Sequence, residues 1–292
     1  MPEASKSAVR RRLIEEADLP GVVACLRRGF PTRPKAYWTR ALARMAGRPA
    51  IEGAPRYGYL LEAGPRIVGV LLVIAARHPG PGGAEIRCNL SSWCVDPPWR
   101  AYAPFLNSAA VTDAGITYVN VSPARHTRPV IEALKFRRYC DGQILFVPAL
   151  SPRRPGLRVV AFAEGSPEAA LLPEAERRLL ADHVALGCRA LIVVEAGAAH
   201  PFVFQRRATF HRLLPCQQVI YCRGLDELAL CAGAIGRHLA LRAWPLFVVD
   251  ANGPAPGLVG RYFADRGAKY YRGPAPPALG DLAYTELVIL GP

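Results

Sequence analysis

Apolar and polar residues in the first half of the chain alternate with two different periods. Short apolar runs bounded by Pro, Gly or Asp predict strands, and apolar residues that recur every three or four positions predict helices. The expected strands cover 10–15, 56–62, 67–76, 85–95, 116–121 and 138–147. The expected helices cover 18–28, 35–46, 104–115 and 129–134, and a loop rich in Pro and Gly covers 78–83.

The order of these elements predicts the type of sheet. The strands at 56–62 and 67–76 are separated by Ala63-Gly64-Pro65-Arg66, a hairpin turn that joins antiparallel strands. The strand–helix–strand order over 85–121 instead requires a parallel pair, because a helical crossover brings the chain back in the same direction. We therefore expect an α/β (α+β) fold with a mixed, mostly antiparallel twisted sheet flanked by helices.

The second half begins after the Pro- and Arg-rich stretch 151–156 and repeats a similar order. Its expected strands cover 157–162, 190–195, 200–205, 217–222, 245–250, 269–272 and 281–290, and we expect 190–195 and 200–205 to form a second hairpin. Its expected helices cover 173–186, 225–239 and 257–266. The inward face of the first of these helices is made by Ala175, Leu179, Leu180 and Val184. A chain of 292 residues predicts two domains, 1–150 and 157–292, which we expect to pack sheet against sheet.

Composition narrows the class of protein. Hydrophobic residues make up 51% of the chain and low-complexity tracts are absent, which indicates a folded protein. No apolar run is long enough to span a bilayer, and the N-terminal stretch lacks the apolar core of a secretion signal, so we expect a cytoplasmic location. The cysteines lack CxxC spacing and the histidines lack HxH or HExxH spacing, which favours buried free thiols and no metal site.

The net charge of +14 comes almost entirely from arginine, because lysine occurs only at 6, 35, 135 and 269. A basic surface attracts polyanions such as nucleic acid or a phosphate-rich cofactor. The arginines are scattered singly and in pairs, without a basic arm, and abundant Ala, Arg, Pro and Gly also suit a GC-rich genome. We therefore attribute the arginine content first to codon bias and second to an anionic small ligand. We expect no nucleic-acid partner.

Two stretches carry a resemblance to a known superfamily. In 89–110, Val95-Asp96-Pro97 follows a predicted strand, and Trp99 and Arg100 precede a predicted helix. In 119–139, Leu134-Lys135-Phe136-Arg137 joins a predicted helix to the next strand, and Gly267-Ala268-Lys269-Tyr270 takes the matching place in the second half. This pattern resembles the GNAT acyltransferase superfamily, whose members transfer an acyl group from acyl-CoA to an amine or a hydroxyl.

The resemblance implies two GNAT-like domains, of which the second is degenerate. There, only Arg223-Gly224 separates the strand from the helix, which is too short for a phosphate-binding loop. Acetyl-CoA or another acyl-CoA is therefore expected in the first domain, where backbone N–H groups and a helix N-terminus would meet its pyrophosphate. The residues implied to bind it are Trp93, Cys94, Val95, Arg100, Ala101, Tyr102, Ala103 and Phe105.

This loop departs from the family pattern in three places. Ala103 and Phe105 stand where the family has small residues, and Pro104 has no N–H to donate. The change to Ala103 is tolerable, whereas Phe105 and Pro104 weaken the resemblance. If the loop binds acyl-CoA, Arg100 would neutralise a phosphate. The alternative is that this stretch is an ordinary strand–helix turn with the Arg100 side chain in solvent.

Catalytic residues are not specified by the pattern. The family's usual tyrosine acid matches Ile131 and a frequent asparagine matches Ala124, and neither side chain here donates a proton. The candidates that remain are Glu85, Ser91, Ser92, Tyr118 and His126. Small polar residues are unusual inside a strand, so the two serines either line an acceptor pocket, sit at a bulge, or face water. A histidine side chain can act as an acid or a base near neutral pH, but for His126 we favour a surface or cap histidine over a catalytic one.

Two functions follow from the resemblance and stay open at this point. One is an acyl-CoA-dependent acyltransferase with cofactor at 93–106 and a small-molecule or protein acceptor between the halves. The other is a catalytically inactive GNAT-fold binding or regulatory protein, favoured by Ile131 and Ala124. The sequence leaves the acceptor, the acyl length and the oligomeric state open.

Overall fold

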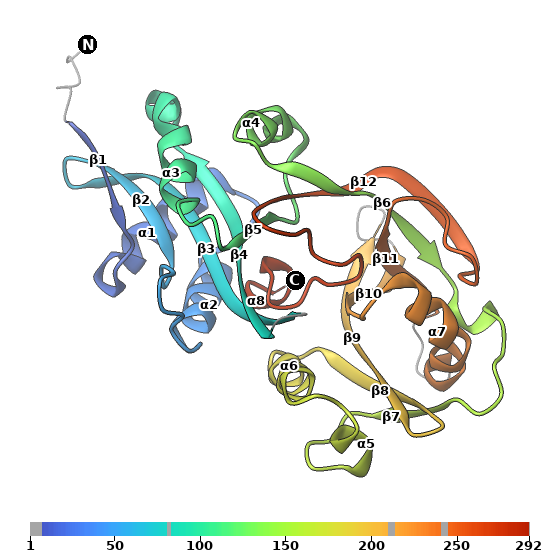
Figure 1. Cartoon of the computed structure of the whole chain (residues 1–292). Coiled ribbons are helices and arrows are strands. Elements are labelled where there is room, and N and C mark those ends of the chain that lie inside the picture. The colour runs from blue at the N-terminus through green and yellow to red at the C-terminus, as the bar shows by residue number, and fades with distance from the viewer. Residues whose placement is uncertain (1–7, 81–82, 210–213, 241–244, 292) are drawn as a thin grey trace.

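The structure is a computed structural model that describes residues 8–80, 83–209, 214–240 and 245–291. Within these residues, twelve strands form one twisted sheet (Figure 1). Listed across the sheet, they are β1 (Val9–Leu13), β2 (Gly58–Ala63), β3 (Arg66–Gly80), β4 (Gly83–Val95), β5 (Thr117–Asn120), β12 (Gly260–Arg272), β6 (Arg137–Phe146), β11 (Phe247–Ala251), β10 (Leu214–Tyr221), β9 (Ala198–Thr209), β8 (Arg189–Glu195) and β7 (Arg158–Ala161).

The strand pairings follow the same succession from either edge of the sheet. β4 pairs with β5 in parallel, as β10 does with β11, and the other pairings are antiparallel. At the centre, β12 lies between β5 and β6, and β6 lies between β12 and β11. The expected packing of sheet against sheet is therefore wrong: the halves join edge to edge, and each receives one strand of the other.

Helices cover both faces of this sheet. They are α1 (Leu19–Gly29), α2 (Lys35–Ala46), α3 (Ala103–Ala110), α4 (Arg128–Ala133), α5 (Pro167–Ala170), α6 (Glu174–Ala185), α7 (Leu225–Ala240) and α8 (Glu286–Ile289). Short 3-10 helices are η1 (Glu16–Asp18), η2 (Pro97–Tyr102), η3 (Arg125–Thr127) and η4 (Pro148–Leu150).

The two faces are separated by the alternation of side chains along β3. Val70 and Leu72 pack with α1 and α2, whereas Leu71 and Val73 pack with α3 on the opposite face. Successive side chains of a strand point to opposite faces, so a strand with helices on both sides is apolar at every position. In the second half, α6 and α7 divide in the same way around β9.

Most predicted elements are confirmed, including the helix Lys35–Ala46, both hairpins and the parallel crossover from β4 to β5. The expected fold class is confirmed as well. All eight cysteines are free thiols, seven of them buried, as expected. The expected loop over 78–83 is wrong where described, because β3 continues to Gly80 and β4 begins at Gly83; residues 81 and 82 lie outside the described residues.

The predicted helix over 257–266 is wrong, because this segment belongs to β12. Gly260 to Ala264 pair residue by residue with Phe146 to Gly142 of β6. A Cβ on Gly260 would lie 2.2 Å from the carbonyl oxygen of Leu145. Backbone pairing with a long strand has overridden the local helical pattern of Leu258, Tyr262 and Phe263.

The predicted final strand over 281–290 is wrong as well. The Leu282 N–H donates to the Ile220 carbonyl (2.7 Å), but Tyr284 then takes a left-handed conformation with φ 55° and turns the chain into α8. Figure 1 shows α8 and the end of the described chain between the two halves of the molecule. We call residues 280–291 the C-terminal segment.

The inward face predicted for α6 is partly wrong. Leu179 and Leu180 are buried, but Ala175 and Val184 are exposed, and Glu176 and His183 are buried instead. Each of these polar residues has a partner: Glu176 accepts from the Tyr221 hydroxyl at 3.1 Å, and His183 accepts from the Tyr284 N–H at 3.1 Å. Partnered polar groups can be buried at low cost, so apolarity alone does not predict this face.

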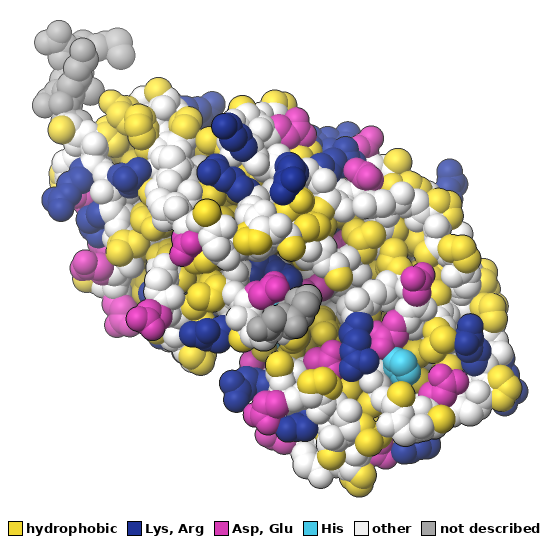
Figure 2. Space-filling view, in the orientation of Figure 1, with side chains coloured by type: hydrophobic (Ala, Val, Ile, Leu, Met, Phe, Trp, Pro, Cys, Tyr) yellow, Lys and Arg dark blue, Asp and Glu magenta, His cyan; other side chains and the backbone are white. Residues whose placement is uncertain are grey.

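Within the described residues, no helix combines the length and the apolar character needed to cross a membrane. Figure 2 shows basic side chains interspersed with acidic ones over the face that it displays, without a continuous basic stripe.

Candidate functional site

The candidate site begins where β4 and β5 part. The two strands pair from Arg87 to Asn89 on β4, and beyond this the Asn89 side-chain amide donates to the carbonyls of Leu90 (3.1 Å) and Val119 (3.3 Å). Gln218 does the same at the other parallel pair, donating to Val219 and Val248, each at 3.3 Å. Each parallel pair therefore ends at a buried amide that bridges the two strands.

A β-bulge lies just beyond this point on β4. Ser91 faces Leu72 and Cys94 faces Val70, so Ser92 and Trp93 together oppose the single residue Leu71. Ser92 has φ 53°, a left-handed conformation that is costly for a residue with a side chain. A bulge removes backbone groups from the ladder and redirects side chains. Of the three alternatives left open for the two serines, the structure places Ser92 at a bulge.

Two pockets lie beside the bulge. The inner pocket has a volume of about 400 Å³ and is lined by Ser91, Ser92, Ser122, Arg207 and Glu286 among others. The outer pocket has a volume of about 570 Å³ and is lined by Cys94, Val95, Arg100, Ala103 and His126 among others. Trp93 and Thr127 line both, so the two pockets share a wall.

Glu286 closes the gap between the parting strands at the inner pocket. Its backbone N–H donates to the Asn89 side-chain oxygen at 2.6 Å. Its carboxylate accepts from the Ser122 hydroxyl (2.6 Å) on the β5 side and from the Ser91 hydroxyl on β4. Burial raises the pKa of Glu286, and these two hydrogen bonds oppose the shift. A carboxylate with a raised pKa is a better base near neutral pH.

Both halves hold the C-terminal segment in place. The Asp281 carboxylate accepts from Arg87 of β4 at 2.7 Å and lies 3.8 Å from the buried His78 of β3. On α6, Asp182 accepts from the Tyr284 hydroxyl at 2.7 Å. Buried groups fixed on two sides position the carboxylate that follows them, so Glu286 is held by contacts to first-half strands and a second-half helix.

The outer pocket is positively charged. Its only described carboxylate, Asp96, accepts from Arg28 at 2.9 and 3.0 Å and from Arg66 at 3.0 Å. Arg100 and His126 form no described hydrogen bond or ion pair, so both have free donors at this pocket. An arginine without a partner beside a strand–helix turn suits a phosphate ligand.

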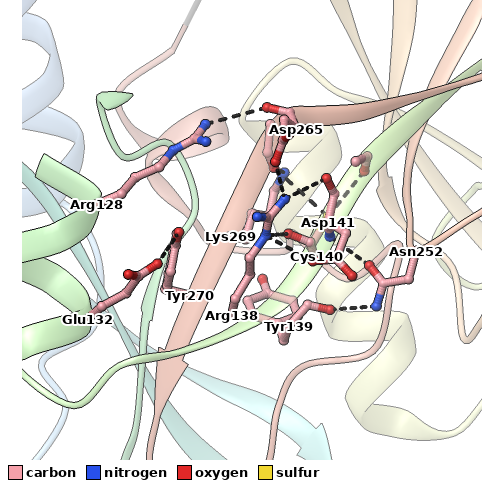
Figure 3. Close-up of polar contacts among 12 residues, drawn as sticks. Arg128, Glu132, Arg138, Tyr139, Cys140, Asp141, Asn252, Asp265, Lys269 and Tyr270 are labelled. Carbon is pink, nitrogen blue, oxygen red and sulfur yellow. Dashed lines mark hydrogen bonds and ion pairs between the residues drawn. The ribbon is translucent and has the colours of Figure 1, made fainter. Parts of the chain in front are cut away.

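Helix α4, which follows the turn that lines the outer pocket, is joined to β12 of the second half by hydrogen bonds. The Tyr270 hydroxyl of β12 donates to Glu132 of α4 at 2.9 Å, and Arg128 of α4 reaches the Asp265 carbonyl (Figure 3). Arg138 of β6 ties the Asp265 carboxylate at 2.8 Å. The strand from the second half therefore fixes α4, whose preceding turn carries His126 and Thr127.

The structure brings together eight of the residues predicted for the site. They are Ser91, Ser92 and Trp93 at the inner pocket and Trp93, Cys94, Val95, Arg100, Ala103 and His126 at the outer pocket. Ala124 lines the inner pocket, and Ile131 is buried in the core.

The other predicted site residues lie elsewhere. Ala101, Tyr102 and Phe105 line neither pocket, and the rings of Tyr102 and Phe105 lie side by side at the surface. Glu85 is exposed at the start of β4. Tyr118 is buried, and its hydroxyl accepts from the Asp113 N–H at 3.2 Å, which leaves it no access to the pockets.

Three residues at the site were missed from the sequence: Glu286, Ser122 and Arg207. The alternation of 281–290 concealed Glu286 as a strand residue, and Ser122 lies just past the end of β5. Arg207 comes from β9, far away in the sequence. No spacing joins these residues, so only the fold brings them to one pocket.

No protein-family model and no curated protein matches the sequence. Solved structures do match. A GCN5-related N-acetyltransferase from Kribbella flavida is 13% identical, with 92% of this chain and 72% of that chain covered and a TM-score of 0.59. One from Anabaena variabilis is 8% identical, with 90% and 72% covered and a TM-score of 0.58. Eis1 from Mycobacterium abscessus is 13% identical, with 91% and 73% covered and a TM-score of 0.50.

At this level of identity the similarity concerns the fold, which is also the fold implied by residues 89–110 and 119–139. The chain therefore has the fold of the GCN5-related N-acetyltransferases.

Proposed function

We propose that this chain is an acyl-CoA-dependent acyltransferase, with acyl-CoA in the outer pocket and the acceptor in the inner pocket. The observation that carries the proposal is Glu286, a carboxylate held by two hydroxyls in the gap between parting parallel strands. Glu286 lines the inner pocket together with Trp93, which also lines the outer pocket. Acceptor and acyl donor would meet there.

The outer pocket fits an acyl-CoA in four respects. Arg100 has no described partner and is available to a phosphate, and Ala103 at the helix start is small. Phe105, which weakened the resemblance, is 54% exposed and does not line the pocket. The Trp93 indole N–H is buried without an acceptor among the described residues, which suits a wall that binds a polar ligand atom.

In the proposed reaction Glu286 removes a proton from the acceptor amine or hydroxyl. The freed lone pair attacks the thioester carbonyl carbon; a C–N or C–O bond forms and the C–S bond breaks. The departing thiolate takes up a proton, which His126 at the outer pocket would donate. Backbone groups released from the ladder by the bulge at Ser92 would stabilise the developing oxyanion.

We further propose that the second half is a degenerate copy of the same fold. The mirrored strand order and the matching amide bridges of Asn89 and Gln218 support this division into 1–150 and 157–292. Beyond Gln218, the gap next to β10 is filled by the C-terminal segment, where Cys222 N–H donates to the Gly280 carbonyl at 3.1 Å. In our proposal this segment occupies the place that a second acyl-CoA would need.

Calorimetry and a thiol-release assay test the function. Acetyl-CoA and longer acyl-CoAs are titrated into the full chain and into Arg100→Glu, and thiol release is then followed with panels of amines and alcohols. We expect saturable binding that Arg100→Glu abolishes, and acceptor-dependent release that Glu286→Gln lowers by about 10²–10⁴-fold while binding is retained.

Absence of binding to every acyl-CoA would overturn the proposal. Binding without release on any panel would favour the inactive GNAT-fold binding protein, the alternative supported by Ile131 and Ala124 at the family's usual catalytic positions. A Glu286→Gln variant with full activity would remove Glu286 from the mechanism.

A further inference from the structure

The inner pocket contains more positive charge than its carboxylate neutralises. Its charged lining residues are Arg33, Arg207 and Glu286. The Ser91 and Ser122 hydroxyls donate hydrogen bonds to the Glu286 carboxylate, and no described ion pair joins this carboxylate to either arginine. The pocket therefore presents one carboxylate and two guanidinium groups to a ligand.

Arg207 is the less explained of the two arginines. It lies on β9, and none of its donors has a described acceptor, although burial lowers its pKa. Arg207 is half-buried, its guanidinium has five N–H donors, and native proteins pair such donors with an acceptor where water does not reach them. Its exposed neighbour Arg206 points to the opposite face of the strand. An unpartnered guanidinium at a pocket indicates an anionic ligand group.

Arg33, which lines the same pocket from the first half of the chain, also indicates an anionic ligand group. It precedes α2, and its guanidinium stacks on the Tyr37 ring with Cζ 4.4 Å from the centroid. Stacking fixes the plane of a guanidinium while its N–H edge stays available for an oxyanion. The rings of Phe30, Tyr37 and Trp38 add an apolar wall to the pocket.

We propose that the acceptor is a small amine that also carries an oxyanion and an apolar body, with the oxyanion bound by Arg207 and Arg33 and the amine directed to Glu286. The proposal rests on the acyltransferase function proposed above. The pocket volume of about 400 Å³ suits an amino-acid-sized molecule. The oxyanion is a carboxylate, as in an amino acid, or a phosphate, and the test separates these sources.

The test measures acceptor binding and turnover separately. Calorimetry in the presence of CoA titrates L-phenylalanine, L-phenylalanine amide and O-phosphoethanolamine into the full chain, and thiol release from acetyl-CoA is measured with the same three compounds. The amide keeps the amine and the ring but lacks the negatively charged carboxylate. The phosphate compound keeps the amine and an oxyanion but lacks the ring.

We expect L-phenylalanine or O-phosphoethanolamine to bind at least tenfold more tightly than the amide. Arg207→Gln should weaken binding and raise KM for the anionic compound by about 10–100-fold, the loss of a charge-assisted pair, and leave the amide within about twofold. Arg33→Gln should act in the same direction, which keeps the test valid if Arg207→Gln does not fold. Arg206→Gln on the opposite face of β9 is the matched control and should change neither.

Equal binding of the amide and the anionic compounds, or an equal loss for all three in Arg207→Gln, would overturn the proposed acceptor class. This outcome is distinguishable from failure of the proposed function. Anion-selective binding without thiol release would contradict acyl transfer but support the anion site. Thiol release without anion selectivity would support acyl transfer but contradict the anion site.

Discussion

The carboxylates of Asp250 and Glu286 show how the partner of an acid determines its role. Asp250 of β11 lies 2.8 Å from the Lys269 ammonium of β12, and both side chains are 2% exposed. Glu286 is held by hydroxyls, and burial raises its pKa. A full opposite charge fixes a carboxylate as a structural anion, whereas neutral donors leave it able to accept a proton.

Removing the lysine of the structural pair should destabilise the protein strongly. Lys269→Met leaves Asp250 buried without a counter-charge, and we expect a loss of about 3–5 kcal/mol in the free energy of unfolding. Urea unfolding followed by circular dichroism measures it. The double variant Lys269→Met with Asp250→Asn should recover part of the loss; equal losses in the single and double variants would show that the unpaired charge is not the cause.

The pH profile should report Glu286. The base must be ionised, so activity falls as the pH drops through its pKa, and because burial raises that pKa the acid limb of kcat/KM should lie above the ordinary range of a glutamate. Initial rates from pH 4 to 8, with buffers of constant ionic strength, measure the limb. It should be missing from the residual activity of Glu286→Gln; an unchanged limb there would assign it to another group.

At the scale of elements, the sequence predicts what local periods determine. The helix Lys35–Ala46 has a clear apolar stripe, and the turns around Gly64 and Gly197 fix two hairpins. The period fails at β12, because Gly260 and its neighbours pair with a strand more than a hundred positions away in the chain. Such pairing leaves no local trace in the sequence.

The candidate site divides in the same way. Its outer pocket is built mostly from one contiguous stretch, so the resemblance around Arg100 locates it. Its inner pocket draws Ser122, Arg207 and Glu286 from three separate elements. Tyr102 and Phe105 were predicted to bind because they follow the motif, but Tyr102 at the end of η2 and Phe105 in α3 both have exposed side chains.

Helix α7 provides a test of close packing between elements. A Cβ on Gly236 would lie 2.1 Å from the Ala149 nitrogen of η4. Alanine gains at most about 1 kcal/mol in helix propensity, while such overpacking costs about 1–3 kcal/mol, so Gly236→Ala should destabilise the protein in thermal and urea unfolding. Gly224→Ala, before the same helix and with no atom within 4 Å, is the control. A more stable Gly236→Ala variant would contradict this packing.

At the scale of the whole molecule, the halves should not fold apart. A fragment of residues 1–150 contains β6 without either of its neighbours, β11 and β12. We expect this fragment to show no cooperative thermal transition, whereas the full chain unfolds in one. Mixing it with a fragment of residues 157–292 should restore the transition, and a cooperative transition of 1–150 alone would contradict the exchange of strands.

The buried His78 should make the stability of the whole chain depend on pH. Burial lowers its pKa to about 3, whereas an unfolded histidine titrates near 6.5, so the unfolded state binds the extra proton. The contribution is complete above pH 6.5 and is lost as the pH falls towards 3. Between pH 7 and 5 we expect a loss of about 2 kcal/mol from this group, with a further loss from His183, whose pKa burial also lowers.

Urea unfolding at pH 7 and 5 measures this dependence. His78→Gln should reduce it by about 2 kcal/mol, whereas the exposed His126→Gln should leave it unchanged. The same dependence in His78→Gln as in the unaltered protein would show that His78 is not the group responsible.

The central position of β6 also sets the order of events during synthesis. Both strands that flank it leave the ribosome long after it does, so the nascent chain carries β6 with two open edges. The charges of Arg137, Arg138 and Asp141 along the start of this strand would discourage pairing with other chains in the meantime. Because Glu286 follows β12 in the chain, the proposed base is made only after the strands that complete the sheet. A partly synthesised chain would therefore not consume acyl-CoA.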